Sequence, residues 1–103
     1  MPEPRPPSCG WRTCTVDTLL TTRPCILHGV LLIASVAGGD VTMYEGQDTS
    51  SGRQIAQIKA LATATVPVNW NPGLLCERGL YVDVGSNVTE VHVYFTELPA
   101  QVA

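Results

Sequence analysis

Charged residues are scarce in this chain. They make up 15% of its 103 residues, whereas soluble domains carry about 25% on average. The six lysines and arginines are scattered and are outnumbered by nine aspartates and glutamates, so the formal net charge is −3. Because contact with nucleic acid depends on basic patches that neutralise phosphates, we expect no direct nucleic-acid binding. The low charge also suggests that partners cover part of the surface.

Long hydrophobic runs are missing as well. The longest, residues 30–34, is far shorter than the roughly 20 apolar residues of a membrane-spanning helix. Residues 1–24 contain no apolar stretch of the kind that forms the core of a signal peptide. We therefore predict no membrane contact and synthesis in the cytoplasm.

Cysteine occurs four times, at positions 9, 14, 25 and 76. In a secreted chain this number would allow several alternative disulfide pairings, but without an export signal we expect all the thiols to stay reduced. A structural zinc site would need two close pairs of ligands, and Cys9 and Cys14 form the only close pair of cysteines. The sequence therefore predicts no metal site.

Residue patterns that carry catalysis or bind cofactors are also missing. Neither His28 nor His92 is accompanied by a nucleophile motif. Glu77 and Asp83 are interpreted as solvated surface rather than as the carboxylate pair of a glycosidase. Gly38-Gly39 precedes an expected strand, whereas a phosphate-binding glycine loop leads into a helix. We predict no catalytic residue, no cofactor and no enzymatic activity.

The chain does contain enough apolar residues for one small core. Hydrophobic residues make up 45% of it, and a chain of about 100 residues has room for one domain. Such a domain buries only about two-thirds of the surface that its unfolded chain exposes. We therefore expect modest stability in isolation and association into a homo-oligomer.

From residue 25 onward, short apolar stretches alternate with turn residues at intervals of about ten, which is typical of a β-sandwich or barrel. The expected strands cover 25–35, 41–44, 64–70, 74–77, 80–84 and 89–96. Residues 54–62 are ambiguous, because Ile55, Ile58 and Leu61 also recur at near-helical spacing, but their flanks favour a strand. The prediction is an all-β fold, an antiparallel β-sandwich of six to seven strands, formed by a domain of residues 25–103.

Residues 1–24 have a different pattern. Prolines at positions 2, 4, 6, 7 and 24 favour extended backbone, so we predict an extended Pro-rich N-terminal arm. Its second half carries side chains that are too apolar to be left in water, and we expect them to bind another chain. The residues assigned to this partner interface are Trp11, Arg12, Val16, Leu19 and Leu20.

Aromatic side chains are few, and several fall on strand faces opposite the expected aliphatic core. They are Trp11, Tyr44, Trp70, Tyr81 and Tyr94. Together they suggest either a platform for sugars or nucleic-acid bases or ordinary cross-strand packing and subunit contact. The second interpretation is favoured, because base stacking would call for neighbouring Arg and Lys residues that this sequence does not supply.

Four segments resemble the small β-sandwich proteins of tailed-bacteriophage virions. They are Gly29-Val30-Leu31-Leu32, Asp40-Val41-Thr42-Met43-Tyr44-Glu45-Gly46, Gly79-Leu80-Tyr81-Val82-Asp83-Val84 and the closing stretch 88–95. The similarity is one of pattern: a strand, Asp-x-x-x-Tyr-x-Gly, a polar loop, Gly-Leu-Tyr-Val, a turn and a last strand. It extends over about residues 25–97 and leaves out the arm.

The resemblance implies a virion structural protein without catalytic residues. The implied role is that of a capsid cement or decoration protein, a trimer on the capsid surface that binds over junctions of the major capsid protein and stabilises the phage head. The alternatives are a tail or neck component of the same virion, a carbohydrate-binding adhesin module, and a fragment of a cytosolic enzyme. Co-purification with particles, or binding to glycans without them, would distinguish these roles.

Overall fold

The computed structural model describes residues 10–98. These residues form strands and loops, and none of them is helical. The strands are β1 (Gly10–Cys14), β2 (Thr18–Thr21), β3 (Cys25–Ala34), β4 (Gly39–Glu45), β5 (Arg53–Ala60), β6 (Thr65–Cys76), β7 (Leu80–Val84) and β8 (Val88–Glu97). The predicted all-β fold is confirmed, with eight described strands rather than six to seven.

The higher strand number has two sources. β1 and β2 lie where the sequence predicts an arm, and the expected strands 64–70 and 74–77 are one strand, β6. The register of β6 against β3 shifts between its residues 69 and 74, so Asn71-Pro72-Gly73 forms a bulge instead of ending the strand. An edge strand tolerates a bulge and a proline because one of its sides has no partner. Residues 54–62 were the ambiguous stretch, and β5 confirms the strand interpretation there.

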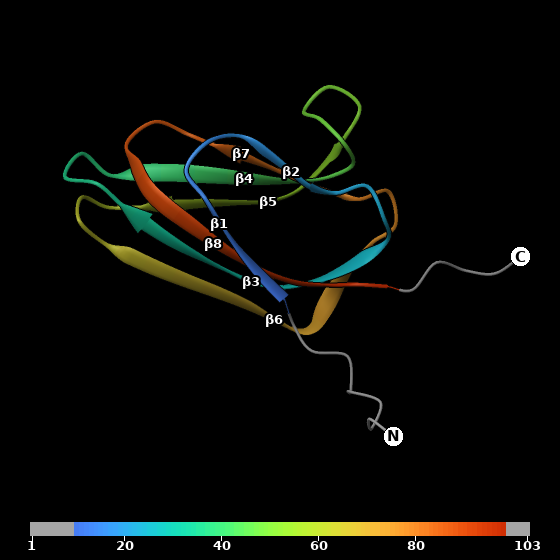
Figure 1. Ribbon diagram of the computed structural model, residues 1–103. Coiled ribbons are helices and arrows are strands. Elements are labelled where there is room, and N and C mark those ends of the chain that lie inside the picture. The colour runs from blue at the N-terminus through green and yellow to red at the C-terminus, as the bar shows by residue number, and fades with distance from the viewer. Residues whose placement is uncertain (1–9, 99–103) are drawn as a thin grey trace, which may run out of the picture.

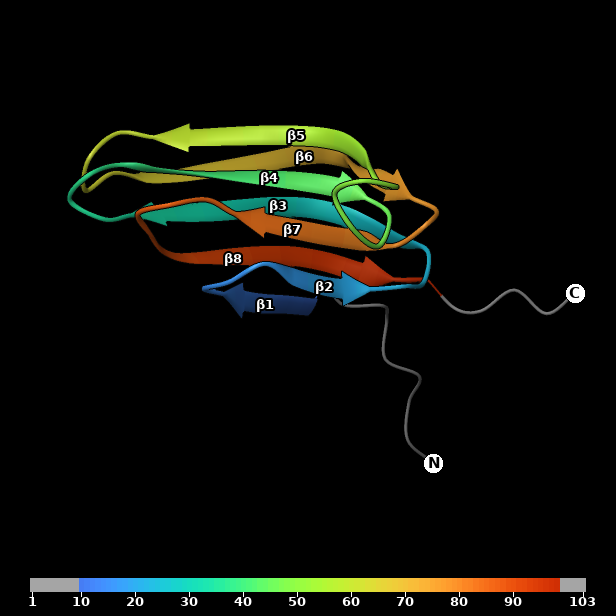
Figure 2. The same cartoon turned by 90° about the horizontal axis from the view of Figure 1, so that it is seen from above.

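The strands form two four-stranded antiparallel sheets, in the orders β1-β8-β3-β6 and β2-β7-β4-β5. Figure 1 shows one sheet lying over the other, an arrangement compatible with a β-sandwich. Seen from above, β1 and β2 lie at one edge of the two layers, and β5 and β6 lie at the opposite edge (Figure 2).

One core fills the space between the sheets. Its fully buried side chains come from both layers: Leu27, Val30, Leu32, Val91 and Val93 from one, and Val41, Met43, Leu80 and Val82 from the other. In β7 and β8 buried and half-buried residues alternate, as the two-residue period of the sequence predicts. This alternation decides which side chains face outward, and therefore sets the character of each outer face.

Over residues 10–24 the predicted arm is part of the two-sheet fold, which corrects the boundary placed between residues 24 and 25. β1 pairs with β8 in one sheet, and β2 pairs with β7 in the other. Cys14 and Leu20 are buried in the core. The prolines that suggest an arm lie before residue 8 and at Pro24, so residues 10–21 are free to pair with sheet edges and satisfy their backbone hydrogen bonds. Residues 1–9 lie outside the described part of the chain.

Candidate interaction faces

Each sheet presents an outer face, and the two faces differ in chemistry. On the β1-β8-β3-β6 sheet, the register and the alternation of burial place mostly uncharged residues outward. These residues, called the neutral face below, are Trp11, Thr13, Ile26, His28, Leu31, Ile33, Thr65, Pro67, Asn69, Leu75, Glu90, His92, Tyr94 and Thr96. Apart from its two histidines, Glu90 is the one acidic or basic residue among these outward strand positions.

A chain of polar contacts crosses the neutral face at β1 and β8. His92 Nδ1 and Thr13 Oγ1 share a hydrogen bond of 3.0 Å, and His92 Nε2 lies 3.3 Å from Glu90 Oε1. The indole of Trp11 covers the same imidazole, with ring centroids 5.5 Å apart. Farther along the sheet, His28 Nε2 and Thr96 Oγ1 share a second hydrogen bond, also of 3.0 Å. Five polar side chains of this face, those of Thr13, His28, Glu90, His92 and Thr96, are thus engaged with one another rather than only with water.

Thr13, His92 and Glu90 lie in the order of a nucleophile, a base and an orienting carboxylate. This grouping was not predicted from the sequence, because Thr13 and His92 are 79 positions apart. Acyl transfer also requires a site for the substrate beside the nucleophile and donors for its oxyanion. One depression of this face does not include Thr13 among its lining residues, and the Trp11 indole lies against the imidazole. We therefore interpret the three residues as a structural contact.

That depression has a volume of about 430 Å³ and lies over the middle of β3 and β6. It is lined by His28, Gly29, Val30, Leu31, Pro67, Asn69 and Tyr94. At its floor, a Cβ on Gly29 would lie 2.6 Å from Asn69 Oδ1 and 2.9 Å from the Val68 carbonyl oxygen. Only glycine lets β6 approach this closely. The hollow could therefore accept an apolar side chain of a partner, and no Asp, Glu, Lys or Arg is among its lining residues.

The outer face of the β2-β7-β4-β5 sheet carries carboxylates. The residues that define this acidic face are Asp17, Leu19, Asp40, Tyr44, Gln57, Lys59, Tyr81 and Asp83. Asp17 Oδ1 accepts a hydrogen bond of 2.8 Å from the Val84 N–H, which fixes it beside Asp83. Partial burial, followed by the negative charge of Asp17, raises the pKa of Asp83 above its ordinary value. The rings of Tyr44 and Tyr81 meet edge to face, 6.5 Å apart.

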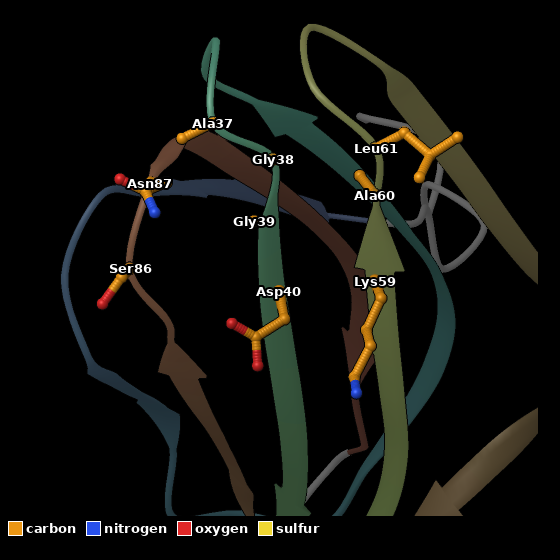
Figure 3. A pocket seen from close by; sticks show the side chains of 9 residues that line it. All are labelled: Ala37, Gly38, Gly39, Asp40, Lys59, Ala60, Leu61, Ser86 and Asn87. Carbon is orange, nitrogen blue, oxygen red and sulfur yellow. The ribbon is translucent and has the colours of Figure 1, made fainter.

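A second hollow lies at one end of the acidic face and is shown in Figure 3. It has a volume of about 560 Å³. Asp40 and Lys59 come from paired positions of β4 and β5, and Ser86 and Asn87 come from the turn after β7. In Figure 3, Asp40 lies in the middle on β4, with Ser86 and Asn87 to one side of it and Lys59 to the other. The hollow therefore offers one residue of each charge but no convergent set of catalytic groups.

The structure separates the residues assigned to the partner interface. Trp11 is 59% exposed and lies on the neutral face, whereas Leu19 is 39% exposed beside Tyr81 on the acidic face. Val16 is exposed in the turn between β1 and β2, and Arg12 is exposed on β1. Leu20 belongs to the core, so its assignment to a partner interface is wrong. The sequence cannot distinguish an inward from an outward leucine when the two are adjacent and the register of the strand is unknown.

The aromatic residues do not form one platform. Trp11 and Tyr94 lie on the neutral face, and Tyr44 and Tyr81 lie on the acidic face. Trp70 is half-buried and packs against the core. This distribution favours packing and contact over a continuous stacking surface.

Comparison with protein families, curated proteins and solved structures finds no match to this chain. Within residues 10–98 no three His, Cys, Asp or Glu side chains are grouped so as to hold a metal ion. The same residues include no helix of the length and hydropathy needed to cross a membrane. Inference about function therefore depends on the geometry of the two faces and on the sequence pattern.

Proposed function

We propose that the protein is a structural component of a tailed-bacteriophage virion, a cement or decoration protein that attaches to the major capsid protein through its neutral face. Two observations support the neutral face as the contact surface: it has almost no charged side chains, and it exposes the indole of Trp11. The sequence pattern of residues 25–97 carries the assignment to a virion.

The physical support comes from the cost of removing water. The centres of protein interfaces are depleted in charged residues and enriched in aromatic ones. On the neutral face, the only carboxylate already lies 3.3 Å from a histidine, so a partner has few charges to desolvate. On the acidic face, burial and the negative charge of Asp17 already oppose the ionisation of Asp83, and covering these carboxylates with a partner would add to that cost.

The attachment differs from that of an arm that reaches over a neighbour. β1 and β2 are strands of the fold itself, so Trp11 is held by a sheet rather than by a free segment. A rigid anchor loses little conformational entropy on binding. In a trimer on the capsid, three such faces act together, and a modest affinity per subunit becomes strong attachment through the raised effective concentration.

Attachment can be tested with particles of the virus that encodes the chain, stripped of this protein and then incubated with the purified chain. We expect co-sedimentation with the shell, and sedimentation of the free protein as a trimer. Trp11→Ala should weaken binding by about 1–3 kcal/mol, which is the range for an aromatic anchor. Leu61→Ala is the matched control: Leu61 is 82% exposed but lies outside the neutral face, so its truncation should leave binding unchanged.

Other results would point to the alternatives or reject the docking surface. Images that place the protein on the tail or neck would keep the virion role but reject capsid decoration. Binding to glycans without any particle would favour an adhesin. Equal losses for Trp11→Ala and Leu61→Ala would show that the neutral face is not the contact.

A further inference from the structure

Cys25 and Cys76 form a pair that neither outer face involves. Cys25 is the first residue of β3 and Cys76 is the last residue of β6, and the two lie directly opposite each other in the antiparallel ladder. Both side chains are buried, at 0% and 1% exposure. Because opposed residues point to the same side of a sheet, the two thiols meet inside the core.

The spacing of this pair suits a covalent bond. Directly opposed residues of antiparallel strands have Cα atoms about 4.5–5.5 Å apart, and disulfides join Cα atoms about 4.4–6.8 Å apart. The two thiols already influence each other, since each perturbs the pKa of the other. The Cys76 S–H donates to the Leu74 carbonyl oxygen at 3.7 Å. Little backbone movement separates this arrangement from a disulfide.

We infer that Cys25 and Cys76 are a dithiol site that a low-molecular-weight disulfide oxidises to a cross-strand disulfide, which joins edge strand β6 to β3. This goes beyond the proposed attachment, since it concerns the core and not either outer face. It also narrows the prediction of reduced thiols, which we now expect to apply in a reducing cytoplasm but not after release into oxidising surroundings.

The reaction is a pair of thiol–disulfide exchanges. The Cys76 thiolate attacks one sulfur of the oxidant RSSR, so a Cys76–SR bond forms, the S–S bond of RSSR breaks, and RS⁻ leaves and takes up a proton. The Cys25 thiol then loses its proton and attacks the Cys76 sulfur, and a second RSH leaves. In sum, two protein thiols and RSSR give one protein disulfide and two RSH molecules, so the protein loses two electrons and two protons.

The surroundings of the pair favour this order of attack. A hydrogen bond with the Cys25 side chain lowers the pKa of Cys76, which favours the thiolate form of Cys76. The same hydrogen bond, followed by burial, raises the pKa of Cys25 and keeps its proton in place. Because both residues are at strand ends, local opening exposes them without unfolding of either sheet.

Cys14 provides the internal contrast. It is also buried and also in the core, but it lies opposite Val91 rather than another cysteine. Burial alone therefore does not make a thiol part of this site, and the disulfide should be selective for residues 25 and 76.

The experiment uses the full chain, purified under reducing conditions and then incubated with an excess of oxidised glutathione. Thiol titration in denaturant should find all four cysteines reactive before oxidation and two fewer afterwards. The intact mass should fall by that of two hydrogen atoms, and peptide mapping should join residues 25 and 76. A disulfide between Cys25 and Cys76 closes a long loop and so restricts the unfolded chain, which should raise the Tm by at least about 10 °C.

Variants separate the site from general thiol oxidation. Cys14→Ala is the matched control and should lose two thiols on oxidation, as the wild type does, with the same gain in Tm. Cys76→Ala should abolish both the intramolecular bond and the gain. Four results on the wild-type protein would each overturn the inference: persistence of all the thiols, stable mixed adducts with glutathione, a bond that maps to Cys9 or Cys14, or an unchanged Tm. These measurements do not depend on whether Cys76→Ala folds.

Discussion

The two outer faces show how one fold can present two surfaces of different chemistry. Both sheets have four strands, and both contribute aliphatic side chains to the same core. The outward positions differ: one face has a single carboxylate close to a histidine, whereas the other holds Asp17, Asp40 and Asp83 against Lys59. The core defines the fold, but the outward residues decide which face a partner can cover at low cost.

The acidic face requires that edge strand β2 stay paired in its sheet. Substitution of Leu20 tests this requirement. Its side chain is 6% exposed, and its strand β2 is the edge of the acidic sheet. Leu20→Ala removes buried methyl groups and leaves a cavity, so the free energy of unfolding should fall by about 2–5 kcal/mol. Leu19→Ala is the control at the adjacent, outward position and should cost much less. Urea denaturation of both variants measures the difference.

Deletion of residues 1–22 extends the same test. If β1 and β2 belong to the fold, the truncated chain should lose cooperative unfolding, since two sheet edges and two core side chains go with them. A truncated chain that unfolds like the full protein would show that these strands are a removable arm, as the sequence alone suggests.

A new charge sharpens the difference between the faces. Pro67 is exposed on edge strand β6 of the neutral face, and Gln57 is exposed on edge strand β5 of the acidic face. Pro67→Glu should weaken particle binding at least about tenfold, because a partner would bury an unpaired carboxylate. Gln57→Glu adds the same group to the face that we expect to remain in water, and it should not change binding. The reverse pattern would exchange the roles of the two faces.

Much of the fold could be predicted from the sequence where the alternation is regular. The strands β7 and β8 and the turn at Gly38-Gly39 follow from period and turn residues. The strand nature of β5 follows only from its flanks, because the spacing of Ile55, Ile58 and Leu61 is also near-helical. β1 and β2 could not, because four and five residues are too few to show a period and the prolines near them suggested an arm. The sequence predicts two strands in place of β6, because a Pro-Gly bulge in an edge strand has the same sequence signal as a turn.

The faces and the dithiol site depend on pairing between distant strands, and single-sequence patterns do not carry that information. Alternation separates the outward from the inward residues of one strand, but it does not reveal which strands are neighbours in a sheet. Cys25 and Cys76 become a pair only once β3 is known to pair with β6. For the same reason, Thr13 and His92 gave no signal in the sequence.

The smallest effect we expect concerns the carboxylates of the acidic face. The pKa of Asp83 is raised in the folded protein, so the folded state binds this proton more tightly than the unfolded chain does. The resulting stability is fully present below the ordinary aspartate pKa, and it is lost as the pH rises through the raised value. At neutral pH, Asp83→Asn should therefore stabilise the protein slightly, by less than about 1 kcal/mol, and the gain should vanish in acid.

Asp48 is the matched control, because its shift has the opposite sign. Its Oδ1 accepts hydrogen bonds from the backbone and side chains of Ser50 and Ser51, and those from Ser51 lower its pKa most. Its stability contribution is present above the ordinary aspartate pKa and is lost as the pH falls, so Asp48→Asn should destabilise at neutral pH rather than stabilise. Urea denaturation of both variants from pH 3 to pH 7 should give difference curves of opposite slope. Parallel curves would mean that Asp17 does not oppose the ionisation of Asp83, and that the acidic face is no more costly to cover than the neutral one.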